Sequence, residues 1–204
     1  MKHLYLDKKS SNLIILLHGT GGDERSLLGI SEYIDEKASV LALRGNIIEN
    51  GMNRFFKRLK PGVLDFNSLK EETINLKIFI DEFLEKLEEK PKIFILGYSN
   101  GANILASFLK LFGSDFQGSI LLHPMFPFEN TESKNLVNQK IFISYGINDS
   151  MVNHQDILKL NSLFVKNGAL VSLYKYNSGH SISNEELNDL KIWYNYNKKK
   201  ELLI

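Results

Sequence analysis

The chain has 204 residues, of which 43% are hydrophobic and 24% charged, a balance typical of an ordinary globular protein. Its 25 Lys and Arg residues offset 24 Asp and Glu residues, and the net charge of +1 gives no general attraction to nucleic acid. Because cysteine is absent, disulfide bonds, a thiolate nucleophile and zinc–thiolate sites are excluded. We expect one domain over residues 1–204, with no nucleic-acid partner.

The apolar runs are too short to cross a membrane. Residues 13–17 and 93–96 have the length of strands, far below the roughly 20 residues of a membrane helix. The first residues carry charge and lack the apolar core and cleavage site of a signal peptide. We therefore expect a cytoplasmic protein without membrane insertion, and a homodimer is left open.

Short β-rich runs alternate with longer segments of helical spacing. An edge strand is predicted at residues 3–6, followed by strands at 13–17, 40–43, 92–96, 119–122, 140–144 and 170–176. This alternation predicts an α/β fold, a mostly parallel sheet of about seven strands with helices on both faces. Ser68 with Glu71, and Ser183 with Glu186, have the spacing of capping boxes at helix starts. Residues 44–67 and 123–139 are predicted as long loops.

A G-x-S-x-G pattern covers residues 97–101, between the buried strand 92–96 and an apolar helix that runs to Phe112. In the α/β-hydrolase fold this strand–turn–helix setting exposes a nucleophilic serine, here Ser99, on a strained turn. It also places the serine at a helix N-terminus, which favours the negative charge of acyl transfer. An isolated match would be read as a plain Gly-Ser turn, but its setting favours a nucleophile.

A nucleophilic serine needs a histidine base, which in this fold follows an acid along the chain. Of the three later histidines, His180 lies in a small-residue loop between the last strand and the last helix, where the base is expected. His123 precedes any well-placed acid and is predicted to border the site. His154 begins a polar helix, which favours a surface position.

Asp149 is the best candidate for the acid, because it directly follows the strand at residues 140–144 and emerges at the C-terminal edge of the sheet. Glu129 and Glu132 precede that strand, and Asp156 lies on a helix. These three are worse placed for a fixed hydrogen bond to an imidazole. Taken alone, Asp149 is equally typical of a turn.

A glycine-rich turn follows the strand at residues 13–17. Its Thr20 amide and the Asn100 amide are predicted to form an oxyanion hole, with His18 holding the turn. A nucleotide-binding loop is disfavoured, because no Gly-Lys-Ser/Thr follows and Glu24 occupies the third glycine position of G-x-G-x-x-G. Metal-ligand spacing such as H-x-x-x-H is also absent, so neither a cofactor nor a metal is expected.

At residues 17–24, 54–59, 97–103, 146–149 and 178–180 the sequence resembles the phospholipase/carboxylesterase family of small α/β-hydrolases, which includes acyl-protein thioesterases. The resemblance implies a metal-independent serine esterase with Ser99, Asp149 and His180 as its triad. Thioesterase members usually have Leu and Gln where this chain has Thr20 and Asn100, which favours the bacterial carboxylesterase branch. That branch would have arginine in place of His123.

Substrate preference depends on the two long loops. Their apolar side chains are predicted to form an acyl pocket, or alternatively to anchor the loops to the core. The chain has little room for a helical lid, which favours small or short-chain esters. An acyl-protein thioesterase or lysophospholipase with the same triad is the alternative, and a non-catalytic binding protein is disfavoured by the intact triad. The pocket candidates are Met52, Phe55, Phe56, His123, Met125, Phe126 and Phe128.

Overall fold

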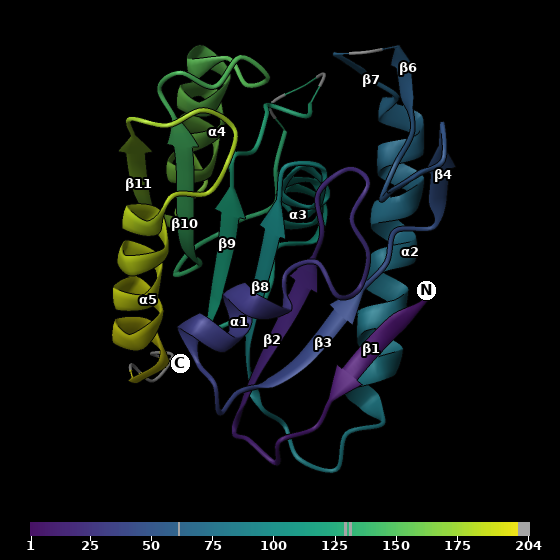
Figure 1. Ribbon diagram of the computed structural model, residues 1–204, viewed down its shortest axis with the longest axis vertical. Coiled ribbons are helices and arrows are strands. Elements are labelled where there is room, and N and C mark those ends of the chain that lie inside the picture. The colour runs from purple at the N-terminus through teal and green to yellow at the C-terminus, as the bar shows by residue number, and fades with distance from the viewer. Residues whose placement is uncertain (61, 129, 131, 200–204) are drawn as a thin grey trace.

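A seven-stranded sheet forms the centre of the fold, in the order β1-β3-β2-β8-β9-β10-β11 (Figure 1). This computed structural model describes residues 1–60, 62–128, 130 and 132–199. All neighbouring strands are parallel except β1, which runs antiparallel to β3 at one edge. The predicted sheet and its antiparallel edge strand are therefore confirmed. The strands are β1 (His3–Leu6), β2 (Asn12–Leu17), β3 (Ser39–Leu43), β8 (Lys92–Tyr98), β9 (Gly118–Leu122), β10 (Lys140–Gly146) and β11 (Leu170–Tyr176).

Helices cover both faces of this sheet (Figure 1). They are α1 (Leu28–Ile34), α2 (Phe66–Glu85), α3 (Asn100–Phe112), α4 (His154–Lys166) and α5 (Asn184–Lys199). The helices α1 and α5 pack on one face, and α2, α3 and α4 on the other. In the described part of the chain, none of them combines the length and apolar character needed to cross a membrane.

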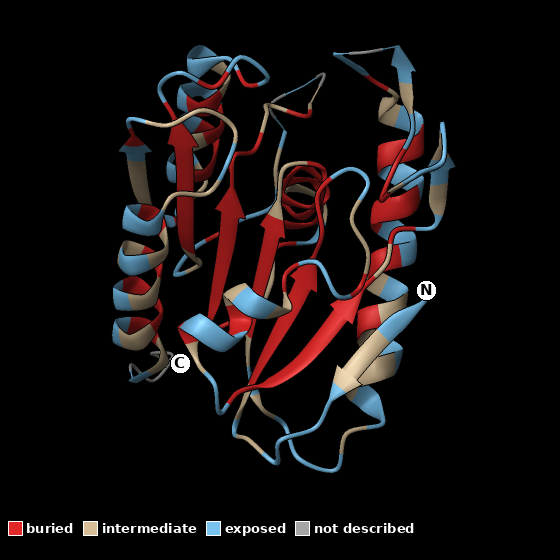
Figure 2. Ribbon diagram, in the orientation of Figure 1, coloured by how far each residue is buried: buried red, intermediate tan, exposed pale blue. Residues whose placement is uncertain are grey.

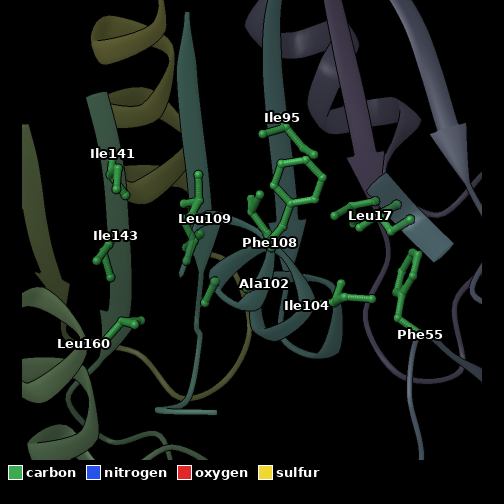
Figure 3. Packing of buried hydrophobic residues seen from close by; sticks show 14 of the residues in the cluster. Leu17, Phe55, Ile95, Ala102, Ile104, Phe108, Leu109, Ile141, Ile143 and Leu160 are labelled. Carbon is green, nitrogen blue, oxygen red and sulfur yellow. The ribbon is translucent and has the colours of Figure 1, made fainter. Parts of the chain in front are cut away.

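The hydrophobic core has a layer on each face of the sheet. The central strands β2, β3, β9 and most of β8 and β10 are buried, whereas each helix buries the stripe that faces them (Figure 2). On the α3 side, Ile95 and Ile143 of the sheet meet Ala102 and Phe108 of α3 and Leu160 of α4 (Figure 3). Burial at about 25 cal/mol per Å² of apolar surface makes these layers the main source of stability.

Two small hairpins occupy the segment between β3 and α2, which the sequence analysis assigned to a loop. They pair β4 (Ile47–Glu49) with β5 (Met52–Arg54), and β6 (Arg58–Lys60) with β7 (Val63–Leu64). Strands of two or three residues are too short to show alternating polarity, so this prediction was wrong in detail. The hairpins lie near the C-terminal ends of the parallel strands (Figure 1).

One of the two predicted capping boxes is present. The Glu186 amide donates to Ser183 Oγ, and the Ser183 amide donates to Glu186 Oε2, which is the reciprocal pair expected at the start of α5. At the start of α2, however, Asp65 is the cap and accepts a hydrogen bond from the Ser68 amide. The helix therefore begins three residues earlier than the predicted capping box would place it.

Candidate active site

Ser99 occupies a tight turn between β8 and α3. Its backbone has φ 52° and ψ −111°, a conformation that costs a non-glycine residue on the order of 1–3 kcal/mol. The flanking glycines make the turn possible, because a Cβ at Gly97 would lie 2.3 Å from the Gly101 oxygen, and one at Gly101 would lie 2.0 Å from the Leu17 oxygen. The sharp turn leaves the Ser99 side chain at the C-terminal edge of the sheet.

The structure brings Ser99, His180 and Asp149 together. His180 Nε2 lies 2.8 Å from Ser99 Oγ, and His180 Nδ1 lies 2.7 Å from Asp149 Oδ2. These residues come from three loops that leave the same edge of the sheet, after β8, β10 and β11 (Figure 1). Parallel strands make this convergence possible, because their C-terminal ends lie together.

Burial increases from Ser99 through His180 to Asp149. Ser99 is half-buried and the His180 side chain is 20% exposed, whereas the Asp149 side chain has no exposed surface. Burial alone would raise the pKa of Asp149, but hydrogen bonds from His180, His123 and the Met151 amide hold that pKa below its ordinary value. Asp149 is therefore a carboxylate at neutral pH.

His123 lies behind Asp149 and has no exposed surface. Its Nδ1 lies 3.1 Å from Asp149 Oδ2, and its Nε2 lies 3.2 Å from Glu186 Oε2. It therefore borders the site from inside the protein, and a direct substrate contact from this position is not available. Glu186 was missed as a site residue, because its sequence pattern signals only a helix start.

The other titratable candidates lie away from this cluster or outside the described residues. His154 is exposed at the start of α4, as predicted, and Glu132 is exposed. Glu129 lies outside the residues that the structure describes. Among the described residues, His123, Asp149 and His180 are the one group whose side-chain atoms lie close enough together to hold a metal ion, within 4.8 Å. Those atoms are occupied by the hydrogen bonds given above.

The loop that carries Thr20 packs directly against the Ser99 turn. A Cβ at Gly19 would lie 2.8 Å from the Tyr98 ring, so the loop closely approaches the residue before Ser99. The amides of Thr20 and Asn100 have no hydrogen-bond partner in the part of the chain that the structure describes. They are therefore free to bind an oxyanion, as the sequence analysis expects.

Buried polar side chains hold this loop in place. Arg54 Nη1 donates to Thr20 Oγ1 at 2.6 Å, and its guanidinium lies 3.6 Å from the Glu49 carboxylate. The amide of Phe55 donates to Asn100 Oδ1 at 2.7 Å. The hairpin segment after β5 thus connects the Thr20 loop to Asn100, the residue that follows Ser99.

His18 holds the base of the same loop, as predicted. The Gly45 amide donates to His18 Nε2 at 3.1 Å, so the ring proton lies on Nδ1, which donates to the Gly19 oxygen at 2.6 Å. Burial lowers the pKa of His18 below its ordinary value. The ring is therefore neutral and acts as a fixed bridge.

The predicted pocket residues divide into two groups. Phe55 and Phe56 have no exposed surface and pack in the core, so the alternative that they anchor the loop describes them correctly. Met52 is 37% exposed and lies beside Gly21 of the Thr20 loop, where a Cβ would be 3.7 Å from its Cγ. Half-buried Met125, Phe126 and Phe128 pack against the edge of the core.

A parallel sheet with helices on both faces and a Ser–His–Asp arrangement at its C-terminal edge define an α/β-hydrolase. Residues 66–202 match the model of the dienelactone hydrolase family. The chain belongs to this family and is a hydrolase of the carboxylesterase type.

Individual relatives agree with this assignment. The chain is 40% identical over 195 residues to the putative hydrolase MhqD of Bacillus subtilis, a match that covers 95% of this chain and 98% of the relative. It is 38% identical to the Bacillus cereus carboxylesterase, whose crystal structure superimposes with a TM-score of 0.92 over 97% of this chain and 94% of that one. A structure of YahD with malic acid has 30% identity and a TM-score of 0.88, covering 96% and 98%. The predicted carboxylesterase-type α/β-hydrolase is confirmed.

Proposed function

We propose that the chain hydrolyses carboxylic esters with Ser99 as nucleophile, His180 as general base and Asp149 as the acid that orients His180. The observation that carries the proposal is the continuous pair of hydrogen bonds, 2.8 Å from Ser99 to His180 and 2.7 Å from His180 to Asp149. The likeness to a carboxylesterase of 38% identity supports an ester as the bond that is cleaved.

In the first half of the reaction, Ser99 Oγ attacks the ester carbonyl carbon while His180 Nε2 takes its proton. Asp149 keeps the proton of His180 on Nδ1 and stabilises the imidazolium that forms. The negative oxygen of the tetrahedral intermediate binds the amides of Thr20 and Asn100, and the N-terminus of α3 favours its charge. Loss of one such donor typically costs about 3 kcal/mol of transition-state stabilisation.

In the second half, His180 gives its proton to the departing alcohol, which leaves an acyl group on Ser99. A water then loses a proton to His180 and attacks the acyl carbonyl. Collapse of the second intermediate returns the proton to Ser99 and releases the carboxylic acid. The sum of both halves is one ester and one water converted to one acid and one alcohol.

We propose small or short-chain acyl esters as substrates. In the described residues between β3 and α2, the regular structure consists of two short hairpins, which are too small to enclose a long acyl chain. The exposed Met52 beside the oxyanion loop offers apolar contact for a short acyl group. Thioesters and lysophospholipids require the same triad, so they are compared directly in the experiment below.

Labelling with a fluorophosphonate tests the nucleophile. The unmodified protein should acquire one phosphonyl group on the peptide that contains Ser99, and Ser99→Ala should acquire none. Ser133→Ala, which removes the hydroxyl of a half-buried serine outside the Ser99–His180–Asp149 cluster, serves as the matched control and should be labelled at the original rate. Labelling of Ser99→Ala at an unchanged rate would refute the assignment.

A substrate panel tests the acyl preference. Among nitrophenyl esters from acetate to palmitate, we expect the highest kcat/KM for acyl groups of about two to four carbons. Acyl-coenzyme A thioesters and a lysophospholipid are measured beside them. Turnover of long-chain esters alone would contradict the short-chain proposal, and faster hydrolysis of thioesters would favour the alternative.

A further inference from the structure

His123 is surrounded by acceptors on both of its ring nitrogens. Nδ1 faces Asp149 Oδ2 at 3.1 Å, and Nε2 faces Glu186 Oε2 at 3.2 Å. The side chains of His123 and Asp149 have no exposed surface, and neither has that of Glu186. The three groups therefore interact without intervening solvent.

A neutral imidazole has a single N–H and cannot donate to two carboxylates. Both contacts can be hydrogen bonds only when His123 is an imidazolium, or when one of the two acids is protonated and donates to the ring. Burial alone would lower the pKa of His123, but its hydrogen bonds and charge interactions with Glu186 and Asp149 raise that pKa above the ordinary value. Geometry and electrostatics thus favour the same state, an imidazolium between two carboxylates.

The backbone is adapted to this arrangement. His123 has φ 51°, which is uncommon for a residue with a side chain, and it follows β9 just as Ser99 follows β8 with φ 52°. The Ser99 amide donates to the Leu122 oxygen at 2.9 Å, and the His123 amide donates to the Ser144 oxygen at 2.9 Å. The turn that carries the nucleophile is therefore fixed to the residue before His123.

Ser144 and Glu186 close a circuit of hydrogen bonds. Ser144 Oγ donates to Glu186 Oε1 at 2.5 Å, and Glu186 Oε2 faces His123. From His123 the contacts continue through Asp149 and His180. His180 then reaches Ser99, whose amide is anchored beside His123. Asp149 and Ser99 are thereby each held by a contact outside the proposed triad.

We propose that His123 and Glu186 are positioning residues for the proposed triad. His123 carries a proton on each ring nitrogen and holds Asp149 Oδ2 in line with His180, and Glu186 keeps the second proton on His123 Nε2. The effect on catalysis rests on the proposed function. The protonation state of His123 does not, because it follows from buried contacts that exist whatever reaction the protein catalyses.

His123 and Glu186 also act electrostatically on the proposed base, His180. Four titratable groups face His123, namely Asp149, Glu186, His180 and Tyr98, with ring centroids of His180 and Tyr98 at 5.3 and 6.0 Å. A positive His123 disfavours a second positive charge on His180, whereas the more distant Glu186 favours it. If the proton leaves His123 when Glu186 is neutralised, His180 loses the neighbouring positive charge that opposes a charge on its own ring.

Histidine NMR tests the protonation directly and requires no catalytic activity. In protein with ¹⁵N-labelled histidine at pH 8, one histidine should show two ring N–H signals. Both ring N–H signals of this histidine should persist in His3→Gln, His154→Gln and His180→Gln. In Glu186→Gln the same histidine should show only one ring N–H signal. If no histidine other than His180 is doubly protonated at pH 8, the proposal is overturned.

The pH profile of kcat/KM tests the effect on His180. Glu186→Gln removes one charge but retains a side chain that suits the capping box with Ser183. The acid limb of the kcat/KM profile of Glu186→Gln should move to higher pH by about 0.5 to 1 unit. Glu185→Gln, the control on the same helical turn, removes an exposed negative charge and should leave the limb in place.

The direction of the shift separates the outcomes. Glu186 acting on His180 as a simple negative charge would give a shift to lower pH, and a purely structural Glu186 would give no shift. Either result would overturn the proposal. Absence of ester hydrolysis by the unmodified protein would refute the proposed function instead, and the NMR measurement would still decide the state of His123.

Discussion

The Tyr98 hydroxyl donates a hydrogen bond to the backbone oxygen of His180 at 2.7 Å. Tyr98, which precedes Ser99, thus anchors the loop that carries His180, and this contact spans 82 positions of the sequence. Burial, with smaller effects of the Asp149 and Glu186 carboxylates, raises the pKa of Tyr98 above its ordinary value. The hydroxyl is therefore a stable donor at neutral pH.

Tyr98→Phe should loosen this loop without removing any proposed catalytic group. A buried hydrogen bond contributes about 1 kcal/mol, so we expect a comparable loss of unfolding free energy and a several-fold decrease in kcat/KM. Tyr194→Phe is the matched control, because its buried hydroxyl bonds to Asp35 on the α1 side, away from the site. Urea unfolding should show similar losses for both variants, with kcat/KM reduced in Tyr98→Phe alone. Equal kcat/KM values for the two would refute the role of Tyr98.

Gly101→Ala should disrupt the nucleophile turn. The added Cβ would lie 2.0 Å from the Leu17 oxygen, an impossible contact that forces α3 away from β2. We expect a loss of at least about 3 kcal/mol in unfolding free energy, or failure to fold. Gly29→Ala provides the contrast, since it lies exposed in α1 with nothing within 4 Å of the added Cβ. It should gain about 0.5 to 1 kcal/mol by helix propensity. Thermal and urea unfolding measure both changes, and a tolerated Gly101→Ala would contradict the close packing.

Thr20→Val should perturb the loop that we propose supplies one amide of the oxyanion hole. Valine preserves the shape of threonine but leaves a buried N–H of Arg54 without its acceptor, at a cost of about 1–3 kcal/mol in stability. If the amide of Thr20 moves with its side chain, kcat/KM should fall about tenfold or more, up to the effect of a lost oxyanion donor. Thr20→Ser retains the oxygen and should stay within about threefold of the unmodified protein. Similar steady-state kinetics for the two variants would show that the Arg54 contact does not position the amide.

The main elements of the fold could be predicted because parallel strands in the interior are nearly continuous apolar runs. Strands β8 and β10 begin at the predicted residues, and the edge strand β1 lies at the predicted residues 3–6. The hairpin of β4 and β5 was missed although Asn50 and Gly51, both with positive φ, are a recognised turn signal. Its three-residue strands gave no alternation to support that signal.

The candidate site could be assembled from the sequence to the extent that each residue follows a strand end. Ser99, Asp149 and His180 do so, and the structure brings them within hydrogen-bond distance. Glu186 does not follow a strand end. Its contact with His123 spans 63 positions and depends on the local backbone conformation of His123, so the sequence does not signal it. Phe55 and Phe56 could not be assigned, because an aromatic residue in a loop has the same pattern whether its ring faces a pocket or the core.

His18 predicts a specific pH dependence of stability. Its pKa is lowered in the folded protein by burial, whereas in the unfolded chain it takes up a proton near pH 6.5. The unfolded state therefore binds more protons as the pH falls below this value. The stabilising contribution of neutral His18 should be complete above about pH 6.5 and decline below it, by up to about 1.4 kcal/mol per pH unit until the folded-state pKa is reached.

His18→Gln tests this dependence by urea unfolding between about pH 7.5 and pH 5, a range of about 2.5 units that includes the ordinary pKa of histidine. Glutamine can accept from the Gly45 amide and donate to the Gly19 oxygen, but it does not titrate. The variant should be less stable at pH 7.5, because it loses packing against the Phe55 ring at 4.8 Å, yet its stability should fall less steeply with acid. His154→Gln, at an exposed position, should follow the unmodified protein at every pH. A His18→Gln curve parallel to that of the unmodified protein would show that His18 binds protons equally in the folded and unfolded states, so that its burial does not govern the acid sensitivity of the fold.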